Sequence, residues 1–247
     1  MSEAVRIVEK KRIPSGAIML QGLPDVGLVG LIATSYIISE LNLDEIAYVD
    51  SDLLPPIVVL HKGLPHAPLR IYGNKDLIAA ISEIAVPVKA LHRIMRKLVD
   101  WAESKNVTMI LSMGGLPVQN RQDIKEPKVF GAGSSEASLK LLREKGLEIL
   151  NEGFIVGPQA LTMRYCVERK LTAVALLAQS FFNYPDPEAS AVAIKKFAQI
   201  TDKKVDVSDL LEKGEEIRLR ARDIMRRTQS ELNQMKKSQE YDLPLYV

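Results

Sequence analysis

Short apolar runs alternate with longer amphipathic stretches through most of the chain. The short runs predict strands at residues 5–9, 17–21, 45–50, 57–61, 69–72, 77–82, 108–112, 128–131 and 172–179. Between them, apolar residues recur every three or four positions and predict helices at residues 26–41, 88–105, 135–145, 159–169 and 187–201. This alternation is typical of a sheet covered on both faces by helices, so the predicted fold class is α/β.

The connections between strands indicate how the sheet is built. The three runs between residues 56 and 82 are joined by GLPHAP and GNKD, which are too short to contain crossover helices. We therefore expect these runs to pair antiparallel within a mixed sheet. Residues 114–128 combine Gly, Pro and alternating charges without an apolar period, and we expect an exposed loop there.

The pattern changes after residue 206, where Gly and Pro nearly vanish. Apolar side chains then recur about every 3.5 residues, and the stripe includes Leu210, Ile217, Ala221 and Ile224. We expect one helix of roughly 45 Å, long enough to project from the body as a stalk. Its stripe has to pack on the domain itself or on the same helix of other subunits. The predicted divisions are an α/β domain (1–206), a helical extension (207–240) and an apolar docking tail (241–247).

Composition narrows the class of protein further. The chain has 247 residues, with 33 Lys and Arg against 31 Asp and Glu, and this balance argues against a nucleic-acid-binding protein. A single cysteine, Cys166, excludes a disulfide within the chain, and three histidines without ligand spacing predict no metal site. The first residues lack the apolar core of an export signal, and no uncharged run is long enough to span a membrane. We therefore expect a cytoplasmic protein without membrane contact.

A Gly-rich segment lies between the second predicted strand and the first predicted helix, where α/β proteins bind phosphate. It contains Gly22, Pro24, Asp25, Gly27 and Gly30. The segment lacks the Lys of a phosphate loop, and Asp25 occupies the place where an anion would dock. A structural role explains it, with Pro24 setting a turn, Asp25 capping the helix and the glycines allowing close packing on the sheet. We expect no cofactor, and a nucleotide-binding protein or phosphorylase-like enzyme is the alternative.

Two further residues are candidates for catalysis. Ser112 ends a predicted central strand, but the sequence lacks the preceding Gly of a nucleophile elbow. Cys166 lies on a predicted helix without a histidine nearby in the sequence, which is typical of a buried structural cysteine. We therefore assign no catalytic residue and do not expect an enzyme.

Two helices present clusters of basic side chains. The clusters are Lys89, His92, Arg93, Arg96 and Lys97 on one helix, and Arg218, Arg220, Arg222, Arg226 and Arg227 on the last. Neither contains interleaved aromatic residues for base stacking, and the last helix also carries many acidic residues. A solvated or protein-binding surface is therefore favoured over a nucleic-acid site.

The last seven residues are apolar and aromatic, although they follow a highly charged helix. Pro244 ends the helix and favours an extended chain beyond it. The Leu245 side chain, the Tyr246 ring and the carboxylate of Val247 then form one hook that a partner can bind. The alternative is that the tail folds back on its own subunit.

Several segments together resemble the archaeal branch of the proteasome assembly chaperone family. They are GLPDVGLVGLIATSYIISEL (22–41), GGLP (114–117), FNYPDPEASAVAI (182–194), VDVSDLLEKGEEI (205–217) and the C-terminal hook. The resemblance implies a three-layer α/β sandwich with a mixed sheet, related to nucleoside phosphorylase-like folds and without established catalysis. It also implies a homo-oligomer, a small ring or cage, that binds proteasome subunits.

The C-terminal triplet resembles the hydrophobic-Tyr-X motif by which proteasome activators dock between neighbouring α-subunits. The resemblance implies that Leu245 fills an apolar pocket, Tyr246 stabilises the open gate and the Val247 carboxylate pairs with a lysine. We therefore expect an ATP-independent assembly chaperone or activator homologue that binds the α-subunits of the proteasome core particle. A scaffold oligomer with sequestered tails is a further alternative.

Overall fold

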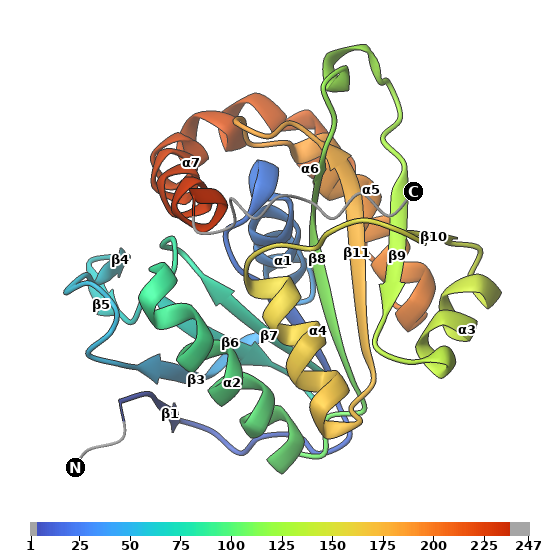
Figure 1. Ribbon diagram of the computed structural model, residues 1–247. Helices are drawn as coiled ribbons and strands as arrows, with labels where there is room; N and C mark the ends of the chain where they lie inside the picture. The colour runs from blue at the N-terminus through green and yellow to red at the C-terminus, as the bar shows by residue number, and fades with distance from the viewer. Residues whose placement is uncertain (1–3, 238–247) are drawn as a thin grey trace.

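The computed structural model describes residues 4–237 and shows the expected α/β architecture (Figure 1). The strands are β1 (Arg6–Glu9), β2 (Ile18–Gly22), β3 (Asp44–Asp50), β4 (Val59–His61), β5 (Leu64–His66), β6 (Leu69–Gly73), β7 (Leu77–Ser82), β8 (Met109–Pro117), β9 (Val129–Gly133), β10 (Glu148–Ile149) and β11 (Ala173–Ser180). The helices are η1 (Val26–Leu28), α1 (Val29–Glu40), α2 (Val88–Ser104), η2 (Arg121–Asp123), α3 (Glu136–Glu144), α4 (Pro158–Arg169), α5 (Pro187–Thr201), α6 (Ser208–Glu212) and α7 (Gly214–Lys237). Every predicted strand and helix corresponds to at least one of these elements.

A nine-stranded mixed sheet forms the middle layer, in the order β1-β3-β6-β7-β2-β8-β11-β9-β10. β2 lies at its centre and pairs in parallel with β7 and β8, and β8 pairs in parallel with β11. β6 and β7 pair antiparallel, as their short connection predicts. Because β2, β8 and β11 are parallel, they end at one edge of the sheet, where many α/β proteins bind their ligands.

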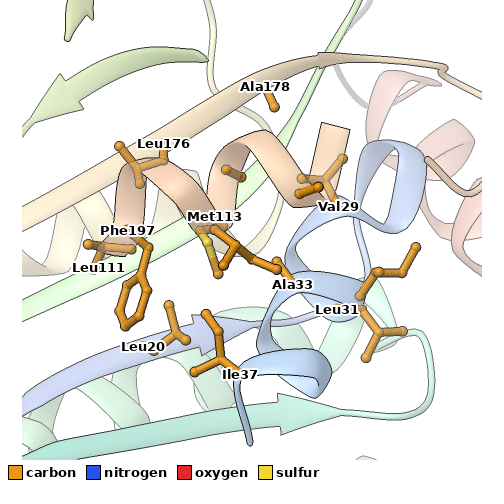
Figure 2. Close-up of a cluster of buried hydrophobic side chains, with 14 of the residues drawn as sticks. Leu20, Val29, Leu31, Ala33, Ile37, Leu111, Met113, Leu176, Ala178 and Phe197 are labelled. Atoms are coloured by element: carbon orange, nitrogen blue, oxygen red, sulfur yellow. The ribbon is translucent and has the colours of Figure 1, made fainter. Parts of the chain in front are cut away.

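Helices cover both faces of this sheet and complete three layers (Figure 1). α2 and α4 pack on one face, with buried side chains that include Ile94 and Tyr165. α1 and α5 pack on the other face, where Figure 2 shows Phe197 of α5 near Leu20 of β2 and Ile37 of α1. The strands in the middle consequently have no polar face, and β7 is buried along its whole length.

The chain around residues 57–66 differs from the prediction. β4 does not join the main sheet but pairs antiparallel with β5, which was not predicted, in a separate hairpin. The turn between them, at Lys62 and Gly63, has positive φ values of 52° and 80°, as tight hairpin turns require. The predicted loop at 114–128 is also partly wrong, because β8 continues to Pro117 and the Arg121 side chain is buried.

The C-terminal helical region is interrupted and lies on the body of the protein. The sequence predicts one helix, whereas α6 ends at Glu212 and α7 begins at Gly214. Leu210 and Met225 belong to the apolar core on the α1 side of the sheet. α7 also contacts η1, α2 and α5, so over the described residues it does not project as the predicted stalk (Figure 1).

Candidate functional site

The Gly-rich segment crosses the edge of the sheet where the central parallel strands end. Asp25 lies in this segment with 6% of its surface exposed. Its Oδ2 atom accepts hydrogen bonds from the Gln159 side-chain amide at 3.0 Å and from the Gly115 backbone N–H at 3.2 Å. The same Gln159 amide donates to the carbonyl oxygen of Met113 at 2.7 Å. Asp25 thus connects the segment to β8 and to α4.

Asp25 occupies the predicted N-cap position, but the predicted capping hydrogen bond from its side chain to η1 is not made. Burial raises the pKa of the Asp25 carboxyl well above its ordinary value of 3.8, and the amides of Gly115 and Gly30 act in the opposite direction. Its Oδ1 atom accepts no hydrogen bond from the residues that the structure describes. Protonation removes a buried charge and leaves Oδ2 able to accept both of its hydrogen bonds.

The glycines of the segment lie where a larger side chain would collide with neighbouring atoms. A Cβ atom on Gly30 would lie 2.2 Å from the carbonyl oxygen of Met113, and one on Gly22 would lie 2.1 Å from Oγ1 of Thr34. Gly27 has a φ of 63°, in the left-handed region that favours glycine. The segment therefore packs directly on β8, and this contact excludes a ligand from between them.

Pro24 lies beneath the last turns of α7. It is buried and, with Thr228, Leu232 and Met235 of that helix, lines a cavity of about 10 Å³. A cavity of this size has room for no more than about one water molecule. α7 therefore covers this part of the sheet edge, and the geometry favours a structural role for the Gly-rich segment over a nucleotide site.

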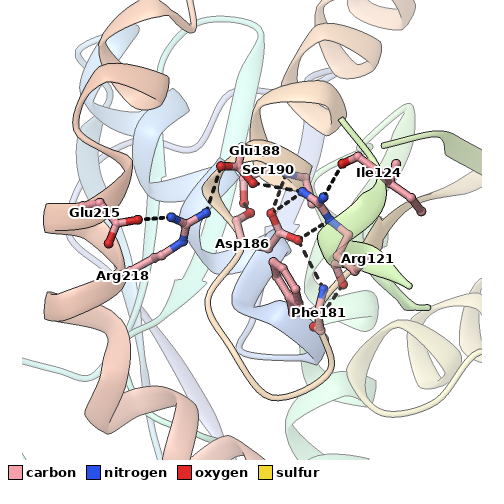
Figure 3. Close-up of polar contacts among 10 residues, drawn as sticks. Arg121, Ile124, Phe181, Asp186, Glu188, Ser190, Glu215 and Arg218 are labelled. Atoms are coloured by element: carbon pink, nitrogen blue, oxygen red, sulfur yellow. Dashed lines mark hydrogen bonds and ion pairs between the residues drawn. The ribbon is translucent and has the colours of Figure 1, made fainter. Parts of the chain in front are cut away.

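Figure 3 shows a buried ion pair that the sequence did not indicate, and the backbone N–H of its Asp186 donates to the carbonyl oxygen of Gly27 in the segment. The guanidinium of Arg121 donates to both carboxylate oxygens of Asp186, at 2.7 and 2.9 Å, and both side chains are almost fully buried. Asp186 also accepts hydrogen bonds from the N–H groups of Phe181 and Ala189. One aspartate therefore caps α5 and holds the loop that follows β8.

The same network continues to α7. Arg121 donates to Glu188 at 3.1 Å, and Glu188 accepts a hydrogen bond from Arg218 of α7 at 2.9 Å. Figure 3 shows this series of contacts from the loop after β8, through the start of α5, to α7. Only one end of this network has a signal in the sequence, the Asp-Pro-Glu start of α5. The composition around Arg121 predicts an exposed loop, so nothing in the sequence indicates that the two are paired.

The residues considered for catalysis, and the nearby His92, are buried or hydrogen-bonded within the fold. Ser112 is buried and donates a hydrogen bond to the carbonyl oxygen of Val174. Burial raises the pKa of the Cys166 thiol to about 12, so this thiol stays neutral at physiological pH. His92 is hydrogen-bonded to the hydroxyl of Tyr165. Within residues 4–237, no hydrogen bond joins Ser112 or Cys166 to a histidine.

The other two histidines lie in an ionic cluster around Arg70. The Arg70 guanidinium is 2.6 Å from Nε2 of His61 and is paired with Glu83, while His66 lies 3.1 Å from Glu45. Burial and the charge of Arg70 lower the pKa of His61. Over the described part of the chain, no three His, Cys, Asp or Glu side chains form a metal-binding group. None of the helices described there is long and apolar enough to cross a membrane.

The stripe predicted for packing lies along a groove between α1 and the C-terminal helices. Leu210 and Ala221 are buried, and Ile217 and Ile224 are half-buried. With side chains of α1 they line a groove of about 610 Å³. One side of the stripe therefore packs on its own chain, and the groove leaves the other side accessible.

Comparison with known proteins gives one consistent result. The PAC2 family model matches residues 19–225. An uncharacterized protein of Methanocaldococcus jannaschii is 28% identical over 248 residues, which cover 100% of both chains. The crystal structure of Pyrococcus furiosus PbaA, described as an archaeal homolog of proteasome-assembly chaperone, has a TM-score of 0.86 and 30% identity, and the match covers 92% of this chain and 98% of PbaA. Pyrococcus furiosus PbaB, described as an archaeal proteasome activator, shares the fold with a TM-score of 0.76 at 23% identity, covering 90% of this chain and 98% of PbaB.

Proposed function

The chain belongs to the PAC2 family, and from this premise we propose that it is a non-enzymatic proteasome assembly chaperone or activator homologue. The observation that carries the proposal is the match to PbaA, which covers nearly the whole chain. The packing around the Gly-rich segment supports the proposal, because the hydrogen-bonded side chains of Asp25 and Gln159 occupy the place where a ligand would approach the sheet edge. We propose that the protein acts in the cytoplasm, without ATP, as a homo-oligomeric ring or cage.

In this proposal the partner is the α-ring of the proteasome core particle. The contact residues are Leu245, Tyr246 and Val247, which lie outside the described residues, so their role rests on the sequence. Leu245 fills an apolar pocket, the Tyr246 ring lies in the adjoining groove, and the Val247 carboxylate pairs with a lysine of the α-subunit. Each hook is small, and tight binding therefore requires several tails to engage at once.

α7 supports this arrangement because its last described turns are anchored on the body of the protein. The buried side chains of Thr228, Leu232 and Met235 anchor them. The Glu231 carboxylate also accepts a hydrogen bond from the backbone N–H of Val88, at the start of α2. A tail attached to an anchored helix starts from one place on the oligomer, which raises its effective concentration at a matching pocket.

Removal of the hook tests this proposal. We expect deletion of residues 245–247, or the Tyr246→Ala substitution, to weaken binding to the proteasome core particle by about 100-fold or more, because every subunit loses its hook and avidity is lost with it. Surface plasmon resonance on immobilised core particle measures the binding. Hydrolysis of a fluorogenic peptide by the core particle measures gate opening.

The matched control is Tyr241→Ala, which removes the same ring from the same tail outside the triplet. It should bind as the wild type does, and unchanged binding by Tyr246→Ala would contradict docking through the triplet. Background binding by every form, with the tail protected from limited proteolysis, would favour the scaffold oligomer with sequestered tails. An increase in melting temperature with nucleosides, nucleotides or phosphate would favour the phosphorylase-like or nucleotide-binding alternative.

A further inference from the structure

A second groove runs between α7 and the loop that precedes α5. It has a volume of about 610 Å³. Two of its apolar side chains, Tyr184 and Leu219, are 68% and 60% exposed, which is high for residues of this kind. In the same groove, α7 presents a row of arginines at intervals of four residues, Arg218, Arg222 and Arg226. The groove thus combines exposed apolar surface with positive charge.

The arginines differ in their partners. Arg218 is paired with Glu188 and Glu215. Arg222 and Arg226 are exposed, and neither has an ion-pair partner among residues 4–237. The groove therefore holds two positive charges that the described protein does not neutralise, and it attracts negatively charged groups.

Tyr184 is held in place by its neighbours. Its ring packs edge-on against Phe181, with ring centroids 6.3 Å apart, and Phe181 lies 5.1 Å from the guanidinium carbon of the buried Arg121. On α7, the Gln229 amide donates a hydrogen bond to the backbone carbonyl of Asn183. A positioned aromatic ring offers contact area to a partner at a low cost in conformational entropy.

We propose that this groove binds an acidic peptide segment of a partner protein, and that the segment also carries an apolar or aromatic side chain. Arg222 and Arg226 lie four residues apart on α7, about 6 Å along its axis. Alternate side chains of an extended peptide are separated by about 6.6 Å, so two acidic residues with one residue between them meet both arginines. A neighbouring apolar side chain contacts Tyr184 and Leu219. The site is independent of the C-terminal triplet and of the function proposed for it.

A peptide fits this groove better than a nucleic-acid strand does. Glu215 lines the same groove, and Asp223 follows Arg222 on the helix, so the positive charges do not form a continuous track for phosphates. Among the residues that line the groove, Tyr184 is the one aromatic ring, whereas Leu219 offers an aliphatic contact, so successive bases of a strand do not find a series of faces on which to stack. The mixture of isolated positive charges and apolar side chains is the complement of an acidic, partly apolar peptide.

The test uses the full chain and a fluorescein-labelled synthetic peptide, Gly-Asp-Leu-Asp-Leu-Asp-Tyr-Gly, titrated by fluorescence polarisation. Two matched peptides replace every Asp by Asn, or every Leu and Tyr by Ser, and both should bind the wild type more weakly. We expect the Arg222→Ala/Arg226→Ala double variant to bind the acidic peptide about tenfold more weakly than the wild type. The Arg220→Ala/Arg227→Ala double variant removes the same charge from the same helix outside the groove and should keep its affinity.

A third variant separates the apolar contribution from the charge. Tyr184→Ser should also weaken binding while keeping the dependence on salt, whereas the Arg222→Ala/Arg226→Ala variant should lose most of that dependence. Equal losses in the two double variants would overturn the proposal. Tighter binding of a short oligo-dT strand than of the peptide would overturn it in favour of a nucleic acid. Binding of a peptide of residues 238–247 instead of the designed peptide would overturn it in favour of the chain's own end.

Discussion

The hydrogen-bond partners of Asp25 are uncharged amides, so its carboxylate is buried without a countercharge. Because its pKa is raised, the folded protein keeps the proton at pH values where the unfolded chain has already lost it. The stability that this residue contributes is complete below its ordinary pKa of 3.8 and is lost as the pH rises through the raised value. The ionisation of this one side chain thus makes the stability of the folded protein depend on pH.

We expect Asp25→Asn to remove this sensitivity. The substituted amide cannot ionise, yet its side-chain oxygen still accepts hydrogen bonds from Gln159 and Gly115. The free energy of unfolding of the variant should therefore rise relative to the wild type as the pH increases above the ordinary pKa of 3.8. Urea unfolding of both proteins at a series of pH values measures the difference between their free energies of unfolding. The contributions of the other titrating groups are the same in both proteins and cancel in this difference. A difference that is constant with pH would contradict a raised pKa at Asp25.

Gly30 is tightly surrounded by backbone atoms, whereas Gly214 has room for a methyl group, so the same substitution at both positions is an informative comparison. A Cβ atom on Gly30 meets the Met113 carbonyl oxygen at 2.2 Å, whereas one on Gly214 meets Pro187 at 3.8 Å. We expect Gly30→Ala to lower the free energy of unfolding by about 3 kcal/mol or more, because the backbone has to move. Gly214→Ala should raise it by roughly 0.4–1 kcal/mol, because alanine restricts the unfolded chain. Thermal unfolding measures both, and similar effects at the two sites would argue against the close contact at Gly30.

Elements whose own residues set a clear period could be predicted from the sequence. For α2, the predicted span 88–105 and the observed Val88–Ser104 nearly coincide. β5 was missed because it is three residues long and contains Pro65, a residue that is rare in strands. The break before Gly214 was missed because the apolar stripe continues across it, from Leu210 to Ile217. The spacing of apolar residues predicts a helix and its buried face, but it does not predict where the helix is interrupted to pack on the body of the protein.

The ion pair of Arg121 and Asp186 could not be predicted, because 65 residues separate its members. We expect Arg121→Ala to lower the free energy of unfolding by about 3–5 kcal/mol, since it leaves the buried Asp186 without its partner. Lys140→Ala breaks an exposed pair with Glu144 and is the control; its effect should stay within about 0.5 kcal/mol. Chemical denaturation measures both, and a small loss for Arg121→Ala would show that the pair does not hold the loop to α5.

At the scale of the whole molecule, α6 and α7 are part of the body as far as residue 237. We expect a chain truncated after residue 206 to lose at least about 5 kcal/mol of stability, because the buried side chains of Val207, Leu210, Ala221 and Met225 are removed. Truncation after residue 240 removes the apolar tail and should leave the melting temperature unchanged. Differential scanning calorimetry compares the two truncations, and equal melting temperatures would show that the helices are dispensable for the fold.

The position of the Gly-rich segment at this edge of the sheet could be predicted from the sequence. The element that covers the edge could not. The strand–loop–helix order around Gly22 is local, and it appears as predicted. The cover comes from Thr228, Leu232 and Met235, which lie about 200 residues further along the chain. No local pattern connects such distant residues, so the structural role of the segment becomes clear only when α7 is seen above Pro24.

The strand order also has a consequence for how the chain acquires its fold during synthesis. β9 emerges from the ribosome before β11, yet in the described sheet it is hydrogen-bonded to β11 and β10 and not to β8. The edge of β9 that pairs with β11 therefore stays unpaired and exposed until β11 has been synthesised and inserts between β9 and β8. In this interval a nascent chain is open to misassembly with other chains. Three of the nine strands, β11, β9 and β10, therefore join the sheet late, and the final third of the polypeptide determines when these strand edges are no longer exposed to aggregation.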